Sequence, residues 1–205
     1  QQLKQAIPIT KAVRLQYPNI INIWGGYFPS NQMEPVLKSG YVDFVINGPG
    51  DQVFPQLLDA LTNGTSHYDI RSIAFMEGDR LVKTPKEPLL EYDSLPDLPY
   101  QKLDRFYPLS RYLGRSYLGQ KTIAYHSSFG CPFKCSFCAV VPIYEARWNG
   151  KSAEKIFKDI LYLKERYGGD AIEFHDNNFF VSEKRTVAFA QLIKKTAVFG
   201  HNCRI

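Results

Sequence analysis

Short apolar runs alternate with helical patterns along this chain, and several of the runs end at glycines. Residues 20–24 predict a buried strand that ends at Gly25-Gly26, and a short helix over residues 33–38 leads to a second strand over residues 42–46. The sequence Asn47-Gly48-Pro49-Gly50 ends that second strand. Strand, glycine turn and helix in this order are typical of an α/β fold with a parallel sheet.

Two further helices fit the same pattern. An N-terminal helix is expected to start or kink at Pro8 and to end at Tyr17-Pro18. Asp51 is expected to cap another helix, which stops at Gly64. Its apolar residues fall on one face: Phe54, Leu57, Leu58 and Leu61.

A hairpin and a proline-rich segment come next. Residues 70–75 and 81–84, joined by a turn at residues 77–80, predict two antiparallel strands. Residues 85–110 contain five prolines and little periodicity, which is typical of a linker or a wrapping segment. We therefore place a connector between domains at residues 85–120.

Residues 121–205 predict the start of a second α/β domain. A strand over residues 122–126 precedes a loop that holds three cysteines. The predicted elements that follow are a helix from a Ser152 cap through Tyr167, a stop at Gly168-Gly169, a strand over residues 171–174, a helix from a Ser182 cap through about residue 198, and a strand near Cys203. The second of these helices is expected to bury four apolar residues: Val187, Phe189, Leu192 and Ile193.

Cysteine usage indicates metal binding rather than a disulfide framework. The chain has four cysteines, and three of them lie within eight residues. A secreted disulfide scaffold would be smaller and richer in cysteine, so we expect a cytoplasmic protein. No apolar run approaches the ~20 residues of a membrane-spanning helix. The net charge of +5 is spread along the chain, which does not favour a nucleic-acid partner.

The clustered cysteines, Cys131, Cys135 and Cys138, follow the pattern C-x3-C-x2-C between a predicted strand and a predicted helix. Their thiolates can converge on one cluster. A [4Fe–4S] cluster ordinarily takes four cysteines, so three would leave one iron open to a substrate or cofactor. An electron carrier of the ferredoxin type is one alternative, and a zinc site is another. Zinc would need a fourth ligand, for which the candidates lack the usual spacing: Cys203, His126, His175 and His201.

The segment from Cys131 to Cys138 resembles the signature of the radical S-adenosylmethionine enzymes, including the aromatic Phe137 before the last cysteine. This resemblance implies a partial (βα)6 barrel in which the three cysteines bind a [4Fe–4S] cluster. The loop would then follow the first strand, at the end of the strands where barrel active sites lie. The resemblance also implies that Phe137 lies against the adenine of S-adenosylmethionine, and the alternative is a core aromatic residue.

Asp176, Asn177 and Asn178 follow the next predicted strand. In many members of the family, a Gly-Gly-Glu stretch at this place binds the amino group of S-adenosylmethionine. The sequence here is closer to the Asp-Asp-x-Phe pattern of the cobalamin-binding subgroup. Carboxylate and amide oxygens can still accept hydrogen bonds from an ammonium group, so we expect these three residues to bind the cofactor. A plain Asx turn is the alternative.

Residues 19–62 resemble the later half of the cobalamin-binding domain that precedes many radical enzymes. Residues 23–29 and 42–51 carry the resemblance, and their turns contain the glycines expected to bind the cofactor: Gly25, Gly26, Gly48 and Gly50. Glycines at strand ends let a flat, bulky ligand approach the backbone, although ordinary turns use glycine as well. The Asp-x-His-x-x-Gly motif that supplies the lower ligand of cobalt is absent, since no histidine precedes His67. That motif is expected to lie upstream.

These resemblances imply a two-domain organisation. Residues 1–84 would form a cobalamin-binding-like α/β domain, residues 85–120 the connector, and residues 121–205 the start of the barrel. Because each domain is incomplete by this interpretation, we expect the chain to be an internal fragment of a longer enzyme.

The resemblance also implies an activity, which is reductive cleavage of S-adenosylmethionine to a 5′-deoxyadenosyl radical. Cobalamin-dependent methyl transfer, or a related C–H reaction such as cyclisation, would follow. A small molecule would be the substrate, and flavodoxin or ferredoxin would be the reductant. The alternatives are a radical enzyme without cobalamin that modifies RNA or a small molecule, and a non-catalytic zinc or iron–sulfur binding module.

Overall fold

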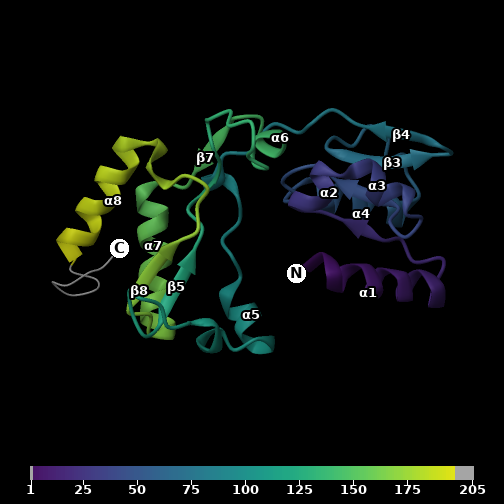
Figure 1. Ribbon diagram of the computed structural model, residues 1–205. Helices are drawn as coiled ribbons and strands as arrows, with labels where there is room; N and C mark the ends of the chain where they lie inside the picture. Colours follow the sequence, from purple (N-terminus) through teal and green to yellow (C-terminus); the bar gives the residue numbers. More distant parts are fainter. Residues whose placement is uncertain (1, 197–205) are drawn as a thin grey trace. The chain divides into compact units, whose positions relative to one another are not determined.

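The computed structural model describes residues 2–196, which form two compact units (Figure 1). The first unit comprises the chain up to Leu89 together with Cys135–Glu145, and the second comprises Leu90–Lys134 and the chain from Ala146 onward. The predicted connector, residues 85–120, spans the first change from one unit to the other. Within the described residues, no helix combines the length and the apolarity needed to cross a membrane.

The first unit is built on a four-stranded sheet in the order β1-β2-β3-β4. Its strands are β1 (Ile23–Trp24), β2 (Phe44–Ile46), β3 (Ile73–Glu77) and β4 (Arg80–Lys83). β1 and β2 are parallel, as predicted, and β3 forms the predicted hairpin with β4. Because β3 runs antiparallel to β2, the sheet is mixed rather than parallel throughout.

Helices cover both faces of this sheet, because successive residues of a strand point in opposite directions. β2 contributes Val45 to the core cluster under α3 (Met33–Lys38) and Ile46 to the cluster under α4 (Val53–Asn63). The other helices of the unit are α1 (Gln2–Gln16), α2 (Tyr27–Asn31) and α6 (Val141–Tyr144).

The helix α4 buries part of the predicted face, since Leu57 is buried and Leu61 packs against the core as predicted. Val53, Leu57 and Ala60 are buried, whereas Phe54 and Leu58 are 43% and 41% exposed. The buried residues recur at intervals of four and three, so Phe54 and Leu58 lie one position around the helix from that stripe. The predicted face is therefore confirmed for Leu57 and Leu61 and wrong for Phe54 and Leu58.

Two predicted boundaries in the first unit are also wrong, those at the starts of α4 and β1. The N-cap of α4 is Gln52 and not Asp51, and its side chain makes no capping hydrogen bond. Of the two alternatives at Pro8, a helix start is wrong because Pro8 lies inside α1, which ends at Gln16, directly before the predicted stop at Tyr17-Pro18. β1 begins at Ile23, later than predicted, and the N–H of Asn22 before it donates to the Asp43 carboxylate (2.7 Å).

The second unit packs two helices against a pair of parallel strands (Figure 1). These elements are β5 (Thr122–Tyr125), β8 (Ala171–Phe174), α7 (Ala153–Tyr167) and α8 (Glu183–Thr196). They agree with the predicted strands and helices. The Ser152 side chain caps α7 by accepting a hydrogen bond from the Lys155 N–H (3.2 Å), and Gly168 ends it with a φ of 74°.

A short antiparallel ribbon in the second unit had no counterpart in the sequence analysis. It pairs β6 (Ser128–Gly130) with β7 (Trp148–Gly150). On α8, Val187 is exposed rather than buried as predicted, and Arg185 is buried. The predicted strand near Cys203 lies outside the described residues.

The proline-rich segment is ordered as part of the second unit from Leu90 onward. It contains α5 (Tyr100–Phe106) and two 3-10 turns. The Asn149 side chain donates to the carbonyl of Leu90 (2.5 Å), and the Tyr92 ring stacks on Phe129 at 4.6 Å. These contacts attach the segment to the ribbon that flanks the cysteine loop.

Candidate functional site

One open pocket of the first unit, about 510 Å³ in volume, is lined by all four glycines predicted to approach cobalamin: Gly25, Gly26, Gly48 and Gly50. The glycines belong to turns that follow β1 and β2, at the carboxyl ends of these parallel strands. Ile46 and Phe54 give the pocket apolar walls, and Asp51 is the one charged residue among those that line it. Open α/β sheets bind ligands at this edge of their strands.

Backbone conformation accounts for two of these glycines. Gly26 has a φ of 97° and Gly48 a φ of 119°, a region that residues with side chains rarely adopt. No atom lies within 4 Å of the position that a Cβ at Gly26 would take. A side chain there would therefore be strained and would extend into the open pocket.

The segment that carries Cys135 and Cys138 folds into the first unit beside this pocket. Lys86 Nζ donates to the carbonyl of Ile143 in α6 (3.1 Å), and Ile143 is buried. The same carbonyl lies 3.8 Å from the position that a Cβ at Gly48 would take. The chain thus passes from the last cysteine of the loop to the rim of the glycine pocket.

All three predicted cluster ligands are free thiols. Cys131 belongs to the second unit, and Cys135 and Cys138 belong to the first, where the Cys138 N–H donates to the Cys135 carbonyl (3.1 Å). Cys135 is exposed and the other two are half-buried. Among residues 2–196, no three His, Cys, Asp or Glu side chains form a preassembled metal site. The donor set itself, three accessible thiols at C-x3-C-x2-C spacing, fits an iron–sulfur cluster with one open iron.

The ring of Phe137 is 91% exposed. A core aromatic residue, the alternative to a role at the adenine, is therefore wrong for this position. An exposed ring next to Cys138 is available to a planar ligand.

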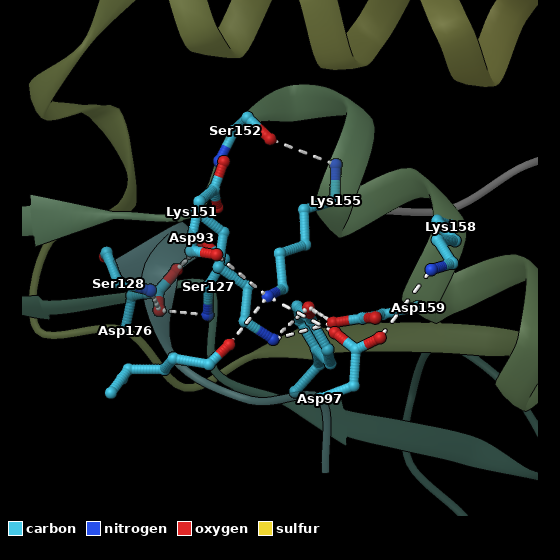
Figure 2. Close-up of polar contacts among 12 residues, drawn as sticks. Asp93, Asp97, Ser127, Ser128, Lys151, Ser152, Lys155, Lys158, Asp159 and Asp176 are labelled. Atoms are coloured by element: carbon cyan, nitrogen blue, oxygen red, sulfur yellow. Dashed lines mark hydrogen bonds and ion pairs between the residues drawn. The ribbon is translucent and has the colours of Figure 1, made fainter. Parts of the chain in front are cut away.

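Asp176 follows β8 and connects it to the residues that precede the cysteine loop (Figure 2). Its Oδ1 accepts hydrogen bonds from the backbone N–H groups of Ser127 and Ser128, both at 2.7 Å, and its Oδ2 accepts one from the Ser127 hydroxyl at 2.6 Å. These partners are 49 and 48 residues away in the sequence. Asp176 therefore makes tertiary contacts and does more than form a local Asx turn.

The other two residues predicted to bind S-adenosylmethionine differ from Asp176 in their surroundings. Asn177 is exposed, and Asn178 is half-buried. The backbone carbonyl of Asn178 accepts a hydrogen bond from Trp148 Nε1 (3.1 Å). Asp176 and Asn178 are thus half-buried and Asn177 is exposed, and the Asp176 carboxylate accepts three hydrogen bonds from the protein.

Two buried cations of the second unit, Lys151 and Arg185, were not predicted from the sequence. Lys151 donates to Asp159 Oδ2 at 2.7 Å (Figure 2). It also donates to the Tyr125 hydroxyl at 2.7 Å. Burial, together with the hydrogen bond to Asp159, raises the pKa of Tyr125 well above its usual range. Arg185 lies four residues before Phe189 on the buried stripe of α8. A charged residue at that apolar spacing was the signal that could have revealed it.

No family model matches the chain. It is 28% identical over 192 residues to an uncharacterized methyltransferase of Pyrococcus horikoshii, covering 93% of this chain and 40% of that protein. It is 25% identical over 186 residues to the anaerobic magnesium-protoporphyrin IX monomethyl ester cyclase of Synechocystis, covering 90% of this chain and 36% of the cyclase. It is 26% identical over 141 residues to the cobalamin-dependent radical SAM methyltransferase TokK of Streptomyces tokunonensis, covering 66% and 20%. The chain therefore spans at most 40% of the length of these relatives.

Two solved structures share its fold. One is the cobalamin-dependent S-adenosylmethionine radical enzyme OxsB with aqua-cobalamin and S-adenosylmethionine bound, with a TM-score of 0.75 and 18% identity over 95% of this chain and 27% of that chain. The other is the radical S-adenosylmethionine methyltransferase TsrM from Kitasatospora setae with cobalamin and a [4Fe–4S] cluster bound, with a TM-score of 0.57 and 16% identity over 84% and 33%. The mixed α/β fold of this chain matches a third or less of each.

Proposed function

The chain is related to the cobalamin-dependent radical S-adenosylmethionine enzymes, and from this relationship we propose that it contributes sites for a [4Fe–4S] cluster, S-adenosylmethionine and cobalamin. One observation supports the proposal most directly. The segment with Cys135 and Cys138 packs beside a pocket lined by four glycines, within one folded unit. Chemistry that uses two cofactors requires their binding residues to be close.

In this proposal the thiolates of Cys131, Cys135 and Cys138 hold three irons, and the fourth iron is open to S-adenosylmethionine. The exposed ring of Phe137 stacks against the adenine. The side chains of Asn177 and Asn178 accept hydrogen bonds from the ammonium group. Asp176 has three of its acceptor positions engaged by Ser127 and Ser128, so it contributes less to the cofactor than sequence reasoning expected.

The glycine pocket is the proposed cobalamin site. Gly25, Gly26, Gly48 and Gly50 present backbone without side chains, and the apolar walls suit one face of a corrin ring. Histidine is absent from the residues that line the pocket, so the pocket itself provides no imidazole ligand for cobalt. The proposed domains are those expected from the sequence: the later half of a cobalamin-binding domain at residues 1–84, and the first βα units of a barrel at residues 121–205.

When bound, the reduced cluster supplies the electron that cleaves S-adenosylmethionine to methionine and a 5′-deoxyadenosyl radical, and cobalamin supplies the methyl group in the methyltransferase branch. The protein's part is to bind and orient. The three cysteines leave one iron of the cluster free to bind S-adenosylmethionine. The glycine turns leave room for the corrin ring of cobalamin beside the segment that carries Cys135 and Cys138. We include in the proposal a small-molecule substrate and a reductant of the flavodoxin or ferredoxin type.

Cofactor analysis of the full-length protein tests this proposal. After anaerobic reconstitution we expect about four irons and four sulfides per chain, together with bound cobalamin. Cys131→Ala, Cys135→Ala and Cys138→Ala should each lose the iron, whereas Cys203→Ala, the control outside the loop, should keep it. Stoichiometric zinc that depends on Cys203 would identify a zinc module instead. A protein that binds iron and sulfide but no cobalamin would support the proposed cluster site and contradict the proposed cobalamin site.

A further inference from the structure

The residues that lead into the cysteine loop are polar and yet almost completely buried. Ser127 is 0% exposed and Ser128 is 1% exposed. Ser128 begins β6, which ends at Gly130, so Cys131 follows the strand directly. Buried polar groups require hydrogen-bond partners, and here the partners determine the path of the chain into the loop.

Two oppositely charged residues from different segments hold Ser127. Asp176 accepts the three hydrogen bonds described above. Arg185 of α8 donates from Nη1 to the Ser127 carbonyl (3.2 Å) and hydroxyl (3.0 Å), and from Nη2 to the Phe179 carbonyl (2.6 Å). The Ser127 hydroxyl therefore donates to Asp176 and accepts from Arg185, and it links the two charges through one side chain.

Aromatic rings fix the Arg185 guanidinium as well. Its central carbon lies 4.9 Å from the Trp148 ring centre and 4.8 Å from that of Phe179. A Cβ at Gly150 would lie 2.8 Å from the Trp148 ring and 2.9 Å from Arg185 Nη1, so this close packing requires glycine. Trp148 pairs with Gly130 across the β6–β7 ribbon, directly before the first cysteine. Arg185 thus supports both the hydrogen bonds of Ser127 and the strand that pairs with β6.

We propose that Asp176, Ser127 and Arg185 are positioning residues for the iron–sulfur cluster, because together they fix the backbone that presents Cys131. The inference rests on the proposed function, since it concerns how the Cys131 thiolate is directed at an iron. Groups that orient metal ligands without touching the metal commonly change metal affinity by about 10- to 100-fold. By this inference the Asp176 carboxylate accepts hydrogen bonds from Ser127 and Ser128 rather than from the ammonium group of S-adenosylmethionine. Asn177 and Asn178 are then the residues proposed to bind the ammonium group.

Lys151 provides a matched control for Arg185. Both are buried cations of the second unit, at 5% and 8% exposure, and Lys151 forms an ion pair with Asp159 at 2.7 Å. The Lys151 side chain contacts Tyr125 and Asp159. Only its backbone N–H reaches the Ser127 carbonyl (2.9 Å), and a side-chain substitution keeps that bond. Lys151→Met should therefore destabilise the unit without loosening the side chains that hold Ser127.

Iron retention in the reconstituted full-length protein tests the inference. Three quantities are measured for each protein: the rate of iron loss to a chelator, the EPR spectrum of the reduced cluster, and the temperature of thermal unfolding. The proteins compared are wild type, Arg185→Met, Arg185→Lys, Ser127→Ala and Lys151→Met. We expect Arg185→Met and Ser127→Ala to lose iron about 10-fold faster than wild type and to shift the EPR spectrum. Arg185→Lys, which keeps a cationic donor, should recover part of the loss. Lys151→Met should unfold at a lower temperature with the wild-type spectrum and rate.

Three outcomes would overturn the inference. Equal iron loss in Arg185→Met and Lys151→Met, at equal loss of thermal stability, would make Arg185 a structural residue only. If Arg185→Met does not fold, Ser127→Ala tests the inference instead, because it removes one hydroxyl and keeps both charges. Wild-type iron retention and a wild-type EPR spectrum in Ser127→Ala would contradict the inference. A wild-type protein that takes up no cluster would refute the proposed function, and the inference would fall with it.

Discussion

Gly26 and Gly40 share an unusual backbone and differ in their surroundings. Their φ angles are 97° and 72°, and neither has an atom within 4 Å of the position that a Cβ would take. Gly26 lines the proposed cobalamin pocket, whereas Gly40 follows α3 and is not among the residues that line it. The pair therefore separates the effect of backbone strain from the effect of filling the pocket.

Gly26→Val is expected to weaken binding of hydroxocobalamin by the full-length protein about 10- to 100-fold, because overpacking costs about 1–3 kcal/mol. Gly40→Val, a valine at another glycine with positive φ, should keep the wild-type dissociation constant. Equilibrium dialysis measures both, with circular dichroism to verify that each variant is folded. An equal loss in the two variants, or wild-type binding by Gly26→Val, would argue against cobalamin in this pocket.

Among the helices and strands, those with strong end signals could be predicted from the sequence. The helix α7 begins at its Ser152 cap and ends at Gly168, since these signals act within a few residues of the helix end. The buried face of α4 could not be predicted as reliably. Whether Val53 or Phe54 faces the sheet depends on where the sheet lies, which the local pattern does not contain. The strands β6 and β7 are too short for a readable alternation.

The same limit applies to the candidate site. Spacing and residue type are enough to propose Cys131 and the glycine turns as ligand sites, because a ligand motif is local in the sequence. The residues that support the motif are not local. Arg185 lies 58 residues from Ser127, and Asp176 lies 49 residues from it, so only the tertiary fold brings them together.

The connection between α7 and β8 depends on a close approach at Gly169. A Cβ at this position would lie 2.3 Å from Cδ1 of Ile123, a buried residue of β5. Gly169→Ala should therefore lower the free energy of unfolding by about 1–3 kcal/mol, measured by urea denaturation. Gly114→Ala, in the same unit and with no atom within 4 Å of the added Cβ, should change it by less than about 0.5 kcal/mol. Equal stabilities would mean that Ile123 repacks without cost.

For the whole molecule, the division into two units places the first cysteine of the loop apart from the glycine pocket, whereas Cys135 and Cys138 share the unit of the pocket. The glycine pocket is lined entirely by residues of the first unit. Cys131 belongs to the second unit, together with Asp176 and Arg185. A substitution of Cys131 and a substitution in the glycine pocket should therefore each leave the other cofactor in place.

Cys131→Ala is expected to abolish iron uptake by the full-length protein and to leave hydroxocobalamin binding at the wild-type level. Gly26→Val should do the reverse, with normal iron content and weak cobalamin binding. Iron and sulfide assays on the same samples used for dialysis measure both effects. If either variant lost both cofactors while remaining folded, the two sites would not be independent, contrary to this expectation.

The first unit is discontinuous in the sequence, and this affects the order in which the protein can fold during synthesis. Lys86 donates to the carbonyl of Ile143, a residue made 57 positions later. The ribosome must therefore release residues 90–134, which belong to the second unit, before α6 can join the first. Closing so long a loop has an entropic cost, although that cost rises only slowly with length. The helix α6 can therefore pack beside the glycine pocket only after all three cysteines have been translated. A truncated protein that ends at Leu89 would lack α6 at this pocket.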